Sequence, residues 1–380
     1  MGSYRQHHAP LRPGMKPLRR CVLQTHIRST QSRETRTMPA PTFGSLSRTA
    51  QAAYGDLLRL HLDEAVPEIL GAIEERRRGP RTYLYDQYRL GTEIRKRYLG
   101  EDTPELRARI ARAAQIRSKA EERRKTMGRL CRLLRTEGPL GVDRGTGSLL
   151  AAFARSGVFR LGGTLVGTAA YGLYQAELGV RFDADELAQT GDIDFASFHR
   201  LSVALEDRVV ETPGAILEGM RFDPVPGIWD RQVWRWIQSS GEVMVEFLTP
   251  AFGDEGVLPL PALGVSAQGL RYLNYLIADP LQAVALYRSG VLVQIPRPER
   301  FAIHKLIVAD RRGARSDPGK AVKDRAQAAL LIEVLAADRP GDLAEALDDA
   351  RGRGQRWRER IAASLALMPE TARTLAALEG

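Results

Sequence analysis

Hydrophobic residues first recur at helical spacing shortly after Ser45, and a basic segment without such a pattern precedes them. Residues 1–37 are rich in Arg, His, Ser, Thr and Pro, which predicts a disordered basic tail, or a true start at Met38. Beyond Pro67 the helical pattern continues. The apolar residues that predict this helical region are Ala50, Ala53, Leu57, Leu58, Leu60, Leu70 and Ile73.

A run of interleaved aromatic and basic residues occupies positions 81–100. Its two short β-prone stretches, separated by polar residues, predict a β-hairpin. Two interpretations of its side chains stay open. Tyrosines can stack bases while the cations hold phosphates, or the tyrosines pack on the next helix of an ordinary half-buried hairpin. The residues concerned are Tyr83, Tyr85, Tyr88 and Tyr98 with Arg81, Arg89, Arg95, Lys96 and Arg97.

The segment from Thr103 to about Arg135 is predicted to be one long helix. Thr103 is a favourable N-cap, Pro104 suits the first helical position and Glu105 complements the helix dipole. A narrow apolar stripe leaves the other faces strongly basic, which indicates a polyanion-binding surface or a solvated helix face. Together with the hairpin, this makes residues 81–135 a candidate RNA-binding region.

The middle of the chain mixes predicted helices and strands. Helices are expected at Thr146–Ser156 and Leu165–Leu178, with a short buried strand at Val158–Leu161 between them. Alternation of apolar residues predicts a β-region from Gly219 to Leu248. From Leu270 onward helices dominate, apart from one strand at 291–295.

Two carboxylates stand out in the sequence Thr190-Gly-Asp-Ile-Asp-Phe195. In a strand, side chains alternate between faces, so Asp192 and Asp194 share one face. Adjacent carboxylates repel each other unless a cation lies between them, and Mg²⁺ or Mn²⁺ with oxygen ligands fits that need. The simpler interpretation is a solvated strand end. Glu246, in the apolar strand Val245-Glu-Phe247, would add a third ligand and a general base for a two-metal site; alternatively it pairs with Arg235 or Arg231.

A phosphate site is predicted at Gly162-Gly163-Thr164, because glycines allow close backbone approach and a helix N-terminus offers free N–H groups. With these motifs in this order, the chain resembles the nucleotidyltransferase superfamily, whose fold is polymerase-β-like. More narrowly it resembles AbiEii-type abortive-infection toxins and related bacterial proteins. The further residues that carry this resemblance are Arg181, Lys305, Lys323 and Asp324.

The resemblance implies an α+β nucleotidyltransferase fold, a mixed β-sheet with helices. It further implies nucleotide binding by Gly162, Gly163, Thr164, Arg181, Lys305, Lys323 and Asp324. The expected organisation is a tail (1–37), a hairpin and basic-helix region (38–142), a nucleotidyltransferase core (143–260) and a mostly helical region (261–380). Two departures from the family pattern are the long spacing between Gly163 and Asp192, and a glutamate at position 246 where many members have aspartate.

The composition of the chain restricts the class of protein and its possible partners. With 43% hydrophobic and 27% charged residues, the chain is typical of a globular protein. Its net charge of +10 favours polyanionic partners. Cys21 and Cys131 suggest no disulfide framework, and the longest weakly polar stretch, Leu161–Tyr174, is too short to span a bilayer. A cytoplasmic location without membrane contact is therefore expected, and nothing predicts the oligomeric state.

The expected activity is metal-dependent transfer of a nucleoside monophosphate from NTP to an acceptor hydroxyl on RNA or protein, which needs mainly positioning and charge neutralisation. Two alternatives stay open. One is a catalytically dormant nucleotide- or RNA-binding regulatory module. The other is a toxin or phage-defence component with the same fold.

Overall fold

The computed structural model describes most of the chain from residue 43 onward. The described residues are 43–63, 71–90, 93–138, 140–182, 192–199, 207–227, 232–241, 243–314 and 317–378. Contacts divide the chain into residues 1–37 and 38–380, and every described residue falls in the second unit. The predicted basic tail thus lies outside the described residues. Within those residues, no helix is long and apolar enough to cross a membrane.

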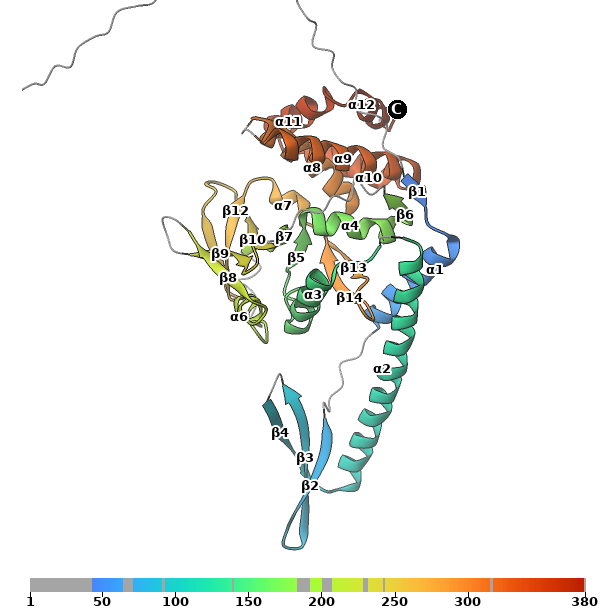
Figure 1. Ribbon diagram of the computed structural model, residues 1–380, viewed down its shortest axis with the longest axis vertical. Coiled ribbons are helices and arrows are strands. Elements are labelled where there is room, and N and C mark those ends of the chain that lie inside the picture. Colours follow the sequence, from blue (N-terminus) through green and yellow to red (C-terminus); the bar gives the residue numbers. More distant parts are fainter. Residues whose placement is uncertain are drawn as a thin grey trace, which may run out of the picture. The chain divides into compact units, whose positions relative to one another are not determined.

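Seven of the described strands form one mixed sheet (Figure 1). The order is β11-β12-β10-β7-β5, with β9 paired to β10 and β8 paired to β9. Strand β10 runs parallel to β7 and β12 and antiparallel to β9. The mixed sheet confirms the predicted α+β class, and β8 to β10 confirm the predicted β-region. The strands are β5 (Thr164–Val166), β7 (Asp192–Ala196), β8 (Phe222–Pro226), β9 (Val233–Gln238), β10 (Met244–Pro250), β11 (Val257–Leu260) and β12 (Val265–Leu270).

One face of β7 and β10 is buried against helix α3 (Arg144–Ser156). The Phe153 ring of α3 lies 4.8 Å from the Phe195 ring of β7, which stacks on the Phe247 ring of β10 at 5.7 Å. Because side chains alternate along a strand, the acidic residues of both strands emerge on the opposite face. Aromatic packing on one side therefore orients the acidic residues on the other.

The connection between α3 and the sheet corrects the prediction. Residues 157–162 form turns rather than a strand, after Gly157 ends α3 with a φ of 95°. The strand comes later, because Leu165 pairs with Phe195 in antiparallel register and its backbone belongs to β5. Helix α4 (Gly167–Leu178) then begins at Gly167 rather than at Leu165. The predicted helix-opening glycines thus lie in the turn before the strand.

Two helices, α1 (Arg48–Leu62) and α2 (Pro104–Thr136), precede this core, and β1 (Phe43–Ser45) pairs with β6 (Val180–Phe182), which follows α4. Helix α2 confirms the predicted long helix. The Thr103 hydroxyl accepts a hydrogen bond from the Leu106 N–H at 3.2 Å, and proline occupies the first turn. Leu57 of α1 and Leu134 of α2 are fully buried in one cluster.

A three-stranded antiparallel sheet contains β2 (Ala72–Arg78), β3 (Arg81–Leu90) and β4 (Glu93–Glu101). Strands β3 and β4 confirm the predicted hairpin. The helical prediction for Ile73 is wrong, because β2 pairs with β3 and takes up its backbone hydrogen bonds. The Tyr98 ring lies 5.4 Å from the Tyr85 ring and stays 56% exposed, so this sheet carries an accessible aromatic surface.

The C-terminal third adds a hairpin and a set of helices to the same hydrophobic core (Figure 1). The predicted strand at 291–295 is present as β14, and it pairs with a strand that was not predicted, β13. The elements are α7 (Leu273–Leu276), β13 (Leu281–Ala285), β14 (Val291–Ile295), α8 (Pro298–Ala314), α9 (Pro318–Asp338), α10 (Pro340–Gly352), α11 (Gln355–Leu365) and α12 (Pro369–Ala376).

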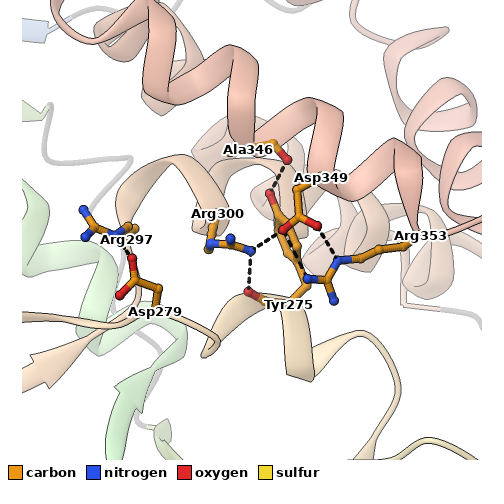
Figure 2. A network of polar contacts seen from close by, with 7 residues as sticks. All are labelled: Tyr275, Asp279, Arg297, Arg300, Ala346, Asp349 and Arg353. Carbon is orange, nitrogen blue, oxygen red and sulfur yellow. Dashed lines mark hydrogen bonds and ion pairs between the residues drawn. The ribbon is translucent and has the colours of Figure 1, made fainter.

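A polar network holds α8 against α7 and α10 (Figure 2). The Arg300 guanidinium of α8 donates to Asp349 of α10 at 2.7 Å and to the Tyr275 carbonyl of α7 at 3.4 Å. The Tyr275 hydroxyl donates to the Ala346 carbonyl at 2.8 Å, and Arg353, the residue directly after α10, pairs with Asp349. This network fixes the first turn of the helix that carries Lys305.

Candidate functional site

The three predicted carboxylates lie on neighbouring parallel strands. Asp194 of β7 is directly opposite Glu246 of β10 in the register, and Asp192 is opposite Met244. Burial raises the pKa of Asp194 to about 7, with further upward contributions from the charges of Glu246 and Asp192. Burial also raises the pKa of Glu246, and the charge of Asp192 adds to this increase. The carboxylates therefore form one electrostatically coupled group.

Helix α4 begins beside this group. Val166 of β5 pairs with Asp194, so the chain enters the helix directly next to that carboxylate. Gly167 has a φ of +65°, and a Cβ there would lie 2.3 Å from the Asp194 Oδ2 atom. No side chain caps the helix start, and the positive end of a helix dipole favours anions. The helix start next to the carboxylates is thus Gly167-Thr168.

The predicted phosphate-binding residues Gly162, Gly163 and Thr164 lie before the start of α4, and two of them have evident structural roles. A Cβ on Gly163 would lie 2.8 Å from the Val158 carbonyl oxygen, so glycine is needed there for packing. The Thr164 hydroxyl is buried and accepts a hydrogen bond from Gln294 at 2.9 Å. The sequence around this helix start is Leu165-Val166-Gly167-Thr168, a short apolar strand followed by glycine and a hydroxyl residue.

Replacing Gly167 by alanine is expected to destabilise the protein by about 1–2 kcal/mol, because the left-handed conformation and the contact with Asp194 both disfavour a Cβ. Urea unfolding measures this loss. The matched control is Gly172→Ala in the same helix, where a Cβ would meet nothing within 4 Å. That control should gain stability, because alanine is the better helix former. Equal effects of both substitutions would contradict the close approach at Gly167.

Lys305 of α8 faces the carboxylates from a buried position. Its Nζ donates to Asp324 Oδ1 of α9 at 2.6 Å, and the other oxygen of Asp324 accepts from Arg312. Burial lowers the pKa of Lys305, and the negative charges of Asp324 and Asp194 oppose this effect. Lys305 and Arg312 in turn work against the raised pKa of Asp194. The predicted residues Lys305 and Asp324 are therefore a buried ion pair beside the carboxylates.

Further cations surround the same group. Lys320 at the start of α9 and Arg235 of β9 both act to lower the pKa of Glu246, and the register places Arg235 opposite Glu246. Burial lowers the pKa of the predicted residue Lys323, which also interacts electrostatically with Asp192. Arg235 acts on Glu246 through its charge, without a side-chain hydrogen bond between them, so a simple salt bridge does not describe Glu246. Arg231, the other predicted partner, lies outside the described residues.

Arg181 is separate from this group. It lies on β6, and its guanidinium pairs with Glu137 at the end of α2 at 3.5 Å. It does not appear among the charges that shift the pKa of Asp194 or Glu246. The structure therefore brings together three predicted carboxylates with Lys305, Lys323 and Asp324, and gives Arg181 a structural partner elsewhere.

A divalent cation fits the donor set in part. In the described part of the chain, no group of three His, Cys, Asp or Glu side chains is already arranged to hold a metal ion. Mg²⁺ usually uses one or two carboxylates together with substrate phosphates and water, so a complete protein cage is not required. Asp192 and Asp194 offer two carboxylates on one face, and the charge of Asp192 contributes to the raised pKa of Asp194, which suits such a cation.

A cavity of about 210 Å³ opens next to Asp192. Thr168 and Ala169 from the first turn of α4 line one side, and Asp143 and Thr146 from the start of α3 line another. The cavity therefore joins a carboxylate of the group to the helix start beside it.

A family model described as nucleotidyltransferase matches residues 144–352, just over half of the chain. The chain belongs to the nucleotidyltransferase family. The match contains all three carboxylates of the group as well as α8 and α9. In this nucleotidyltransferase, the matched region thus contains the seven-stranded sheet together with α8 and α9, and it extends past the boundary predicted at residue 260.

Other comparisons are more distant. An antigenic nucleotidyltransferase-like protein from Paracoccidioides brasiliensis is similar in structure, with a TM-score of 0.36 and 16% identity. The alignment covers 63% of this chain and 95% of that protein. A search of curated proteins found no match. The narrower resemblance to AbiEii-type toxins stays a prediction.

Proposed function

We propose that this nucleotidyltransferase moves a nucleoside monophosphate from NTP to an acceptor hydroxyl, with Mg²⁺ or Mn²⁺ held by Asp192 and Asp194. The observation that carries the proposal is the coupled carboxylate group, which faces an uncapped helix start and a set of cations. When bound, the cation would neutralise charge on the triphosphate and polarise the reacting oxygens.

The residues of the chain have distinct roles in this proposal. The N–H groups at Gly167 and Thr168 bind phosphate oxygens, while Lys320 and Lys323 neutralise the outer phosphates. Lys305 favours the ionised form of Asp194, against the burial that raises its pKa. Glu246 accepts the proton from the acceptor hydroxyl, a role that suits a carboxylate whose pKa is raised toward neutrality.

The test is a transfer assay with each labelled NTP, Mg²⁺, and total cellular RNA or cellular protein as acceptor. We expect one nucleotide to label one acceptor class, and Asp192→Ala to lose this labelling. Asp254→Ala is the matched control, because Asp254 is exposed and does not contribute to the pKa shifts of Asp194 or Glu246. Equal labelling by wild type and Asp192→Ala would reject the proposal. NTP binding without transfer would instead indicate the dormant binding module.

RNA is the acceptor that we favour. Helix α2 is 33 residues long, carries many basic side chains and so presents positive charge over about 50 Å. The Tyr98 ring lies 6.2 Å from the Tyr83 ring and 5.4 Å from the Tyr85 ring, which suits base stacking. A role in phage defence is compatible with this chemistry, and growth arrest on expression that disappears in Asp194→Ala would support it.

A further inference from the structure

A cavity of about 940 Å³ lies among α1, α2, α3 and the β13–β14 hairpin, apart from the carboxylate group. Five arginines line it, and none of its described lining residues is an aspartate or glutamate. We call it the arginine groove. The arginines are Arg123 and Arg124 of α2, Arg155 of α3, Arg160 of the next turn and Arg288 of the hairpin turn.

Most of this positive charge lacks an acidic partner. Arg160 pairs with Asp207, and Arg123 donates to the Asp63 carbonyl oxygen at 3.0 Å. Arg124 and Arg155 are exposed, and no carboxylate among the described residues pairs with either. Like charges that converge on one hollow repel each other and create a positive potential that attracts anions. The groove is therefore short of negative charge.

The hairpin turn that carries Arg288 is held on several sides. The Arg135 guanidinium of α2 donates to the Leu286 carbonyl at 3.1 Å through Nε. On the α3 side, the hydroxyls of Ser148 and Tyr287 are hydrogen-bonded at 2.8 Å. A His61 ring nitrogen of α1 lies 3.2 Å from the Ser289 carbonyl oxygen. These contacts preorganise the wall of the groove, including an Arg288 backbone with a φ of +55°.

We propose that the arginine groove binds the phosphodiester backbone of a single-stranded nucleic acid. All five cations are arginines, whose planar guanidinium groups bind phosphate oxygens through two parallel hydrogen bonds. A single phosphate neutralises one or two of them, whereas a chain of phosphates can reach all five. Gln282, Gln294 and Tyr287 add polar and aromatic contacts along the same walls.

The groove also connects to the carboxylate group through the fold. Gln294 lines the groove and donates to Thr164, the first residue of β5. That strand ends at Val166, opposite Asp194, after about 7 Å. A strand of RNA bound in the groove would thus be anchored one short strand away from the proposed transfer site. That the bound strand is the acceptor of the transfer reaction rests on the proposed function. That the groove binds a phosphodiester backbone does not.

The experiment measures fluorescence anisotropy of labelled 20-nucleotide single-stranded RNA and DNA of mixed sequence with the full chain. The double variant Arg124→Ala/Arg155→Ala removes two exposed cations, and thermal melting checks that it folds. We expect its Kd for the tighter oligonucleotide to rise at least about 10-fold. The slope of log K against log salt should shrink by about 1.4, which corresponds to two phosphate contacts. Arg356→Ala, an exposed arginine of α11, is the matched control and should change Kd less than about 2-fold.

Other results would overturn the proposal. One is unchanged oligonucleotide binding by the folded double variant. Another is that poly-glutamate binds as tightly as RNA and that the substitutions weaken the binding of poly-glutamate alone. This result would assign the groove to an acidic protein partner. Loss of binding in the double variant, in a protein that transfers no nucleotide, would reject the proposed function and support the groove. Transfer of nucleotide to RNA, together with unchanged oligonucleotide binding by the double variant, would support the proposed function and reject the groove as the binding site.

Discussion

Replacing Asp194 by asparagine is expected to lower nucleotidyl transfer by about 100- to 1,000-fold, the loss typical of removing one preorganised charged group. The same substitution should leave the metal-free protein at pH 8 at least as stable as wild type. Asparagine is nearly isosteric, and it removes a buried negative charge that Glu246 and Asp192 both repel. Labelled-NTP transfer and urea unfolding in EDTA measure the two effects.

The raised pKa of Asp194 also predicts how the free energy of unfolding changes with pH. Folding raises the pKa of Asp194 from 3.8 to about 7, so the folded state keeps its proton to a higher pH than the unfolded chain. The stability of the metal-free protein should therefore fall as pH rises from about 4 to about 7. In Asp194→Asn this fall should shrink, leaving the smaller contribution of Glu246, whose pKa is raised as well.

Mg²⁺ and a control complete the experiment. At pH 8, Mg²⁺ should raise the thermal midpoint of the wild type more than that of Asp194→Asn, because binding to the folded state alone stabilises it. Asp254→Asn should behave as wild type in every assay. A variant that keeps wild-type transfer, or that loses stability equally at pH 5 and pH 8, would contradict the coupled carboxylate group.

Replacing Asp324 by alanine should cost about 3–5 kcal/mol of stability, because it leaves Lys305 buried without its partner and also takes away the carboxylate that pairs with Arg312. The Asp324 side chain is only 2% exposed, so water cannot take its place. Equilibrium urea unfolding measures the loss.

A double variant separates stability from chemistry. Lys305→Met with Asp324→Leu exchanges the buried pair for apolar side chains of similar size, which is often neutral or stabilising. We expect it to recover much of the lost stability while transfer stays low, because Lys305 then no longer offsets the raised pKa of Asp194. A double variant with full transfer would show that the pair is only structural.

Local patterns were sufficient for the elements with strong signals of their own. Thr103, Pro104 and the apolar stripe predicted α2, and the structure has the helix with that cap. Alternation placed Asp192 and Asp194 on one face, because the strand geometry of five consecutive residues is a local property. The region of β8 to β10 was predicted for the same reason.

Other predictions failed where pairing with a distant segment overrode the local pattern. Ile73 fits a helix, but its backbone pairs with β3. Leu165 and Val166 also fit a helix, but they pair with β7 and form strand β5. The helix therefore starts at Gly167. The structure pairs Arg181 with Glu137, and its nucleotide-binding role stays a prediction.

By itself, the sequence determined the α+β class, the long basic helix, the presence of three strand carboxylates and the family motifs. The tertiary structure alone decided that Glu246 lies opposite Asp194, that Gly167 contacts the same carboxylate, and that Lys305 and Arg312 share Asp324. It also decided that arginines from α2, α3 and a hairpin converge on one groove. The reason is physical: periodicity records which way a side chain faces on its own element, whereas register and packing between distant elements determine what it meets.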